Sequence, residues 1–154
     1  MAIWQFVIIM LPKKQFSEKH SGIENRLTKS DYENIDFWEG TLLDKSTFNV
    51  FGEVLPRGKS WSDDIHLFGS TDSNCIEIIE DNGKVSEIIA RLDMRTDYDT
   101  VLSVLVEFAI QNSMYLFDNE LEKLPLNGTS IHFHILNSEI YRAFQEIKGR
   151  LEEV

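Results

Sequence analysis

Cysteine, proline and glycine are all scarce in this chain of 154 residues, which has one, three and eight of them. Because Cys75 is the single cysteine, no intramolecular disulfide can form, and this is typical of a reducing compartment. The low proline and glycine content excludes collagen-like and low-complexity sequence. We therefore expect an ordered cytoplasmic protein that is stabilised by an apolar core.

Positive charge is also in short supply. The 15 lysines and arginines face 26 aspartates and glutamates, so the net charge is −11. A surface of this sign repels nucleic-acid backbones and anionic membranes and attracts cationic proteins. We expect a cationic protein partner and neither nucleic acid nor membrane, although the same charge would also serve solubility alone.

Long hydrophobic runs are absent. The apolar segment 1–11 ends at Pro12 and is shorter than the roughly 20 residues that cross a bilayer. It also lacks the basic start and the cleavage site of a secretion signal. Its isoleucine, valine, phenylalanine and tryptophan content instead predicts a strand over 3–10 with both faces covered.

Alternating apolar residues and turn residues predict several further strands. They fall at 35–38, 65–68, 75–80, 85–94 and 114–117. Asn82-Gly83 predicts a tight hairpin between the third and fourth of these, because both residues tolerate positive φ. On the strand 85–94, Ile88, Ala90 and Leu92 share an apolar face, so this sheet should have a core side and a more polar side.

Helical spacing of apolar residues predicts helices at 44–55, at 101–109 and after Ser138. Asp97 or Asp99 can cap the second helix, and Ser138 can cap the last. The five residues 131–135 fit either a strand or a helix. The polar stretch 15–34 and the segment 121–127 are interpreted as irregular connections.

This order of elements favours an α+β fold over a parallel α/β sheet. We expect a mostly antiparallel sheet of about five or six strands with helices against one face and a C-terminal helix. The sequence contains no internal repeat and no linker-like change of composition, so residues 1–154 are expected to form one globular domain.

Motifs for cofactors are missing, and we expect neither a cofactor nor a metal. The chain has no glycine-rich phosphate loop and no CxxC or HExxH motif. His132 and His134 could share a metal on a strand but not on a helix, and no third ligand is near in sequence. Cys75 is most simply a small buried hydrophobic residue.

Arg91, Asp93 and Arg95 recur with the period of a strand and should lie on its polar face. They could form a recognition or catalytic row. Cross-strand ion pairs are the simpler interpretation, which we favour.

Trp61, Asp63, Asp64 and Asp72 flank the predicted strand 65–68. Carboxylates around an aromatic side chain could anchor a basic partner, because aromatic residues dominate binding hot spots. The aspartates could equally be turn formers and helix caps. This group is the strongest interface candidate in the sequence.

A set of spaced residues over roughly 44–146 resembles a recurring pattern in small bacterial proteins of uncharacterised function. It comprises Leu55-Pro56 before Trp61, Phe68-Gly69-Ser70, Asn82-Gly83-Lys84-Val85, Ile88, Arg91 to Arg95, and Ser138, Arg142 and Phe144. Proteins of that kind are similar in size and acidity to immunity proteins of bacterial polymorphic-toxin systems. The resemblance implies a cytoplasmic α+β domain that binds and blocks one toxin, and it transfers no site residue.

Three hypotheses of function follow. The favoured one is a non-enzymatic acidic binding protein, in particular an immunity protein that occludes a basic toxin. The second is a small enzyme whose site is assembled from Arg91, Asp93 and a histidine. The third is a regulatory or structural subunit, either a monomer or a homodimer that pairs through a sheet edge.

Overall fold

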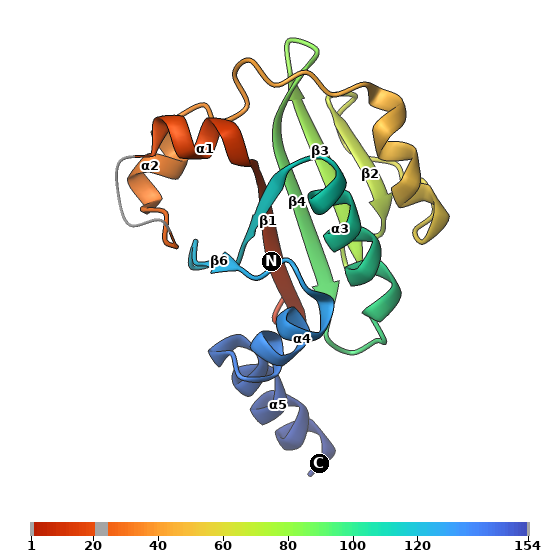
Figure 1. The fold of residues 1–154 in the computed structure, drawn as a ribbon. Helices are drawn as coiled ribbons and strands as arrows, with labels where there is room; N and C mark the ends of the chain where they lie inside the picture. Colours follow the sequence, from red (N-terminus) through yellow and green to blue (C-terminus); the bar gives the residue numbers. More distant parts are fainter. Residues whose placement is uncertain (1, 21–24, 154) are drawn as a thin grey trace.

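A six-stranded antiparallel sheet in the order β2-β3-β4-β1-β5-β6 organises the protein (Figure 1). The computed structural model describes residues 2–20 and 25–153. The strands are β1 (Gln5–Pro12), β2 (Ile65–Gly69), β3 (Cys75–Asp81), β4 (Lys84–Asp93), β5 (Met114–Phe117) and β6 (Lys123–Leu124). The predicted α+β class and antiparallel sheet are confirmed.

The N-terminal strand β1 lies between β4 and β5, and all of its eight residues are buried. Phe6, Ile8 and Met10 enter the main core, whereas Val7, Ile9 and Leu11 enter a second cluster on the opposite face. The prediction of a strand covered on both faces is therefore confirmed, although it extends through Pro12.

The β3–β4 hairpin forms where Asn82-Gly83 predicted it. Asn82 and Gly83 have φ values of +53° and +76°, as a type I′ turn requires. Asp81 pairs with Lys84 across the turn. The local turn chemistry thus sets the register of the two central strands.

Helices cover the two faces unequally. The 3₁₀ helix η1 (Lys45–Glu53) and the helices α3 (Asp99–Gln111), α4 (Gly128–Leu136) and α5 (Glu139–Glu152) all contribute residues to the main core. The shorter α1 (Lys13–Lys19) and α2 (Lys29–Asn34) adjoin the second cluster, which contains Phe16 of α1. Helices on one face were predicted, and the cover over β1 and β5 on the other face is an addition to that prediction.

The stretch 15–34 was expected to be irregular, yet α1 and α2 occupy much of it. Thr28 caps α2 by accepting a hydrogen bond from the Asp31 amide at 3.0 Å. Phe16 is buried against Phe37 and Phe117. Helices α1 and α2 are stabilised by one buried aromatic residue and one N-cap. Their sequences therefore show no apolar residues at helical spacing. Residues 21–24 of the stretch lie outside the described residues.

The strand predicted over 35–38 is wrong, because a turn replaces it. The Asp36 carboxylate accepts the Trp38 amide at 3.0 Å, and the Thr41 amide donates to the Trp38 carbonyl. Aspartate side chains compete in this way with strand pairing. Phe37 and Trp38 are buried in opposite clusters, so their alternation reflects burial on two sides of a turn.

Residues 131–135 belong to helix α4, which resolves the open alternative. Asn127 caps this helix by accepting the Ser130 amide at 2.9 Å. Of the other predicted helices, 44–55 is the 3₁₀ helix η1, while α3 and α5 form as expected. Asp97 accepts the Asp99 amide at the start of α3, and Ser138 caps α5. The connection 121–127 contains β6.

The outer strands of the sheet are partly covered by irregular segments of the same chain. At β2, the Gly58 amide donates to the Leu67 carbonyl, and the Gly69 amide donates to the Pro56 carbonyl. Next to β6, the Lys123 amide donates to the Asn25 carbonyl. This cover reduces the edge on which the homodimer hypothesis depends. Within the described part of the chain, no helix has the length and apolarity that crossing a membrane requires.

Candidate functional site

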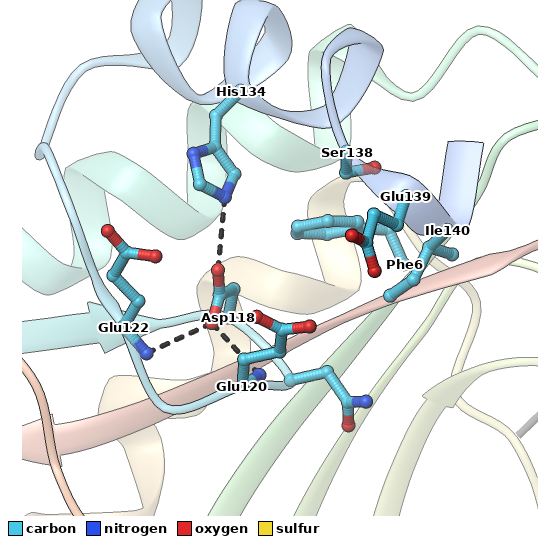
Figure 2. A pocket seen from close by; sticks show the side chains of 9 residues that line it. Phe6, Asp118, Glu120, Glu122, His134, Ser138, Glu139 and Ile140 are labelled. Atoms are coloured by element: carbon cyan, nitrogen blue, oxygen red, sulfur yellow. Dashed lines mark hydrogen bonds and ion pairs between the residues drawn. The ribbon is translucent and has the colours of Figure 1, made fainter. Parts of the chain in front are cut away.

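Asp118 and His134 form the centre of a pocket at one end of the sheet (Figure 2). Asp118 follows β5 directly, and its Oδ1 accepts the amides of Glu120 and Glu122 at 2.9 and 3.0 Å. The Asp118 Oδ2 lies 3.0 Å from Nε2 of His134, which projects from α4. The turn after β5 therefore fixes the carboxylate, and the carboxylate orients the imidazole.

The pocket has a volume of about 170 Å³. Phe6 of β1 contributes an apolar wall, and its ring meets His134 edge-on with 6.2 Å between centroids. Ile140 and Glu139 from the first turn of α5 lie next to Phe6 on the same side, across from Glu122 (Figure 2). The described residues that line it are Phe6, Asp118, Asn119, Glu120, Glu122, His134, Ser138, Glu139 and Ile140.

Four of the side chains that line this pocket are carboxylates, and we call it the acidic pocket. Asp118 is buried and already hydrogen-bonded, while Glu120, Glu122 and Glu139 are exposed and form no ion pair with another residue of the described chain. Among the described residues of the lining, His134 is the one basic group. A lysine or arginine side chain that enters the pocket would meet a surplus of negative charge.

Ser138 is near the histidine in sequence but does not act as a nucleophile in this arrangement. Its Oγ donates to the Ile135 carbonyl at 2.6 Å and accepts the Tyr141 amide at 3.1 Å, as the N-cap of α5. A volume near 170 Å³ is also below the roughly 300–1,000 Å³ of small-molecule sites. The geometry suits a single cationic side chain better than a substrate.

The two histidines of the HxH pair have different partners, because helix α4 separates them. The Nδ1 of His132 lies 2.9 Å from the Tyr98 hydroxyl, and His134 bonds Asp118. Burial raises the pKa of Tyr98 to about 12, so the phenol stays neutral beside His132. Among the described residues, no group of three or more histidines, cysteines and acids is placed to hold a metal.

The predicted row of Arg91, Asp93 and Arg95 forms ion pairs within the chain. Arg91 pairs with Glu77 across β3 and β4. Asp93 is completely buried and accepts hydrogen bonds from Ser73 Oγ at 2.8 Å and from the backbone and guanidinium of Arg95. Only the Arg91–Glu77 pair is the cross-strand ion pair that the sequence favoured, because Asp93 is buried and pairs with Arg95 two residues along the same segment.

The environment of Asp93 explains why it is charged. Burial by itself would raise its pKa, but the hydrogen bonds from Arg95 and Ser73 outweigh burial and hold the pKa below its usual value. Arg95 also stacks on the Trp4 ring, with its guanidinium carbon 4.1 Å from the ring centroid. Arg95 and Trp4 thus join the start of β1 to the end of β4, and Ser73 bonds Asp93 from the connection between β2 and β3. His132 and His134 are bonded to other residues elsewhere in the fold.

The structure does not bring Trp61, Asp63, Asp64 and Asp72 together. The first three precede β2 and are exposed, Trp61 to 89%. Asp72 follows β2, so a strand of five residues, about 16 Å long, separates it from them. Ser70 bonds the Asp72 carboxylate, and Trp4 and Arg95 bond its backbone carbonyl. Asp72 therefore acts as a turn former, and a binding role for Trp61, Asp63, Asp64 and Asp72 stays a prediction.

The sequence analysis missed the acidic pocket, whose residues come from β1, the turn after β5, α4 and α5. One signal was present, because Asp118-Asn119-Glu120-Leu121-Glu122 is an acidic turn placed directly after the predicted strand 114–117. Nothing in the spacing indicated that His134 would lie opposite this turn.

The chain was also compared with models of protein families, with curated proteins and with solved structures, and none of the three comparisons finds a match. The resemblance to immunity proteins therefore stays a prediction.

Proposed function

We propose that this protein is a non-enzymatic binding protein whose acidic pocket receives a lysine or arginine side chain of a basic partner. The observation that carries the proposal is the convergence of Asp118, Glu120, Glu122 and Glu139 on one small pocket. Together with the resemblance given above, this favours an immunity protein that occludes a bacterial toxin. No chemical step by this chain is needed for such a role.

The proposed mechanism has a steering stage and a docking stage. The net charge of −11 attracts a basic partner over long range and raises the association rate. On docking, a cation about 4 Å from a carboxylate gains roughly 1 to 4 kcal/mol of gross Coulomb energy, depending on how much water remains. The Glu120, Glu122 and Glu139 side chains are exposed before docking, so the pocket needs no opening motion.

The experiment that tests the proposal begins with the genes beside this one. We expect a neighbouring gene to encode a basic toxin that copurifies with this protein, and a deletion strain to be inhibited by its sibling cells. The double variant Glu120→Gln and Glu139→Gln should slow association with that toxin and flatten its dependence on salt. A neighbourhood without a toxin, together with normal growth of the deletion strain, would contradict the proposal.

A matched variant separates the two candidate surfaces. Trp61→Ala removes the exposed aromatic residue before β2, which lies outside the lining of the acidic pocket. If Trp61→Ala abolishes binding and the double glutamine variant does not, the surface predicted from the sequence is the interface instead.

The enzyme hypothesis keeps one specific observation in its favour. Asp118 orients His134, as a carboxylate orients a general base in many active sites. This version uses His134 in place of the predicted Arg91 and Asp93, which are bonded elsewhere. Turnover of a small substrate that is lost in His134→Gln and kept in His132→Gln would establish it over the binding function.

A further inference from the structure

A second concave surface lies between the N-terminal residues and helix α5, and we call it the apolar groove. It is lined by Ile3, Trp4, Arg95, Phe144, Ile147, Lys148 and Leu151, and its volume is about 490 Å³. We propose that the apolar groove binds an amphipathic helical segment of another protein, with acidic residues beside its apolar stripe. This proposal does not rest on the function proposed for the acidic pocket.

The helix α5 leaves part of its apolar stripe without cover. Phe144 is buried in the main core, but Ile147 is partly exposed and Leu151 is 73% exposed one and two turns later. The helix extends past the end of the sheet and packs chiefly on α4 (Figure 1). Exposed leucine and isoleucine at helical spacing beside an exposed Ile3 form the kind of patch that marks a binding surface.

The shape of the groove selects the kind of occupant. The distance along α5 from Phe144 to Leu151 is about 11 Å, which is two helical turns. Anchors spaced by three, four and seven residues on a partner helix match that length. A small apolar ligand would leave much of its surface in water here, because the outer wall is the mostly exposed Leu151.

The charges around the apolar groove indicate which residues should flank the apolar stripe of the partner helix. The two charged residues in the described lining, Arg95 and Lys148, are both cationic in a chain of net charge −11. Arg95 is paired with Asp93, whereas Lys148 forms no ion pair with another described residue. On the other border of the stripe Arg150 is exposed, while the exposed acids Glu146 and Glu152 lie farther round α5 from the stripe than these two cations. Carboxylates beside the partner's apolar anchors would complement these cations.

The same charges disfavour a second copy of this chain. In a two-fold pairing of α5 with α5, each Arg150 and Lys148 would approach the same cations of the other copy. A bilayer is disfavoured as well, because the surface is concave and the whole chain is acidic.

The experiment titrates the whole protein with two synthetic amphipathic peptides of about 18 residues, or five helical turns. Both peptides carry the same leucine stripe, flanked by glutamate in one and by lysine in the other. NMR follows the Trp4 indole N–H, which donates to the Asp72 carbonyl at 2.8 Å, and the amides of α5. We expect saturable shifts at these groups and an affinity at least about tenfold higher for the glutamate peptide.

Three variants sharpen the result. Leu151→Gln should weaken the glutamate peptide about tenfold while the circular dichroism of the protein stays unchanged, because Leu151 is exposed. Lys148→Glu should remove or reverse the preference between the peptides. Leu42→Gln is the matched control, since Leu42 is 89% exposed and lies outside the groove.

Several outcomes would overturn the proposal. These are equal affinity for both peptides, no saturation up to about 1 mM, or shifts that survive in Leu151→Gln. If the protein bound anionic vesicles through Leu151 and did not bind the glutamate peptide, the groove would be assigned to a membrane. A concentration-dependent dimer that Leu151→Gln dissolves would assign it to a second copy.

Discussion

Two aspartates of this protein are buried, but one is enclosed by the chain and the other borders a pocket. Asp93 is enclosed and receives hydrogen bonds from Ser73 and Arg95, all within the chain. Asp118 is also buried, but its partner His134 borders a pocket with three further carboxylates. The comparison shows that a buried charge indicates function only where its surroundings remain open to a ligand, because a fully bonded charge has no capacity left for one.

Removing Asp93 should have the largest effect on stability. Asp93→Ala leaves Ser73 and Arg95 without their acceptor, but the guanidinium of Arg95 is partly exposed and regains water, so we expect a loss of about 2–3 kcal/mol. Urea unfolding followed by circular dichroism measures this loss. Asp63→Ala, at an exposed position, is the control and should stay within about 0.5 kcal/mol of the parent. Equal losses in both variants would remove the structural role given to Asp93.

Removing the Asp118 carboxylate should lower the free energy of unfolding less than removing that of Asp93, and it should weaken partner binding more. Asp118→Ala loses two hydrogen bonds to turn amides and the hydrogen bond to the partly exposed His134. We expect a loss of about 1–3 kcal/mol in the same unfolding assay. Asp118→Asn can keep the turn bonds and should recover most of that stability without recovering partner binding. If Asp118→Ala destabilised the protein more than Asp93→Ala, the contrast between the two aspartates would fail.

The dependence of stability on pH tests the ionisation of Asp93, and its expected effect is smaller than that of either alanine substitution. Its pKa is lowered in the folded protein, so its ionisation stabilises the fold above the unfolded pKa of 3.8. This contribution falls as the pH drops through the lower folded pKa. The stability difference between the parent and Asp93→Asn should therefore be constant near neutral pH and shrink below about pH 4. A difference that grew on acidification would contradict the sign of this shift.

The smallest effect on stability is expected in the acidic pocket itself. Glu120→Gln and Glu139→Gln change exposed side chains, so each should alter the free energy of unfolding by less than about 0.5 kcal/mol. Their expected effect is on the association rate with a basic partner, measured at two salt concentrations. A large loss of stability would show that these carboxylates serve the fold.

Much of the sheet could be predicted because its signals are local. Asn82-Gly83 can adopt positive φ, so the β3–β4 hairpin follows from two adjacent residues. The continuous apolar run of β1 requires cover on both faces, and the structure supplies it. The apolar stripe of α3 and the Ser138 cap of α5 likewise act over a few residues.

The remaining elements could not be predicted because distant contacts decide them. Phe16 stabilises α1 by packing against Phe37 and Phe117, which are far away in sequence. The alternation at 35–38 fits a strand, but burial on both sides of a turn produces the same pattern. The acidic pocket escaped prediction for the same reason, since its residues come from four separate parts of the chain.

The sequence by itself determined the charge, the antiparallel hairpin and the apolar faces, because composition, turn chemistry and periodicity act locally. Only the tertiary structure decided which acids are sealed inside and which border a pocket. Asp93 is the last residue of β4 and Asp118 directly follows β5, and their surroundings differ because Arg95 folds back onto Asp93 while His134 of a separate helix meets Asp118.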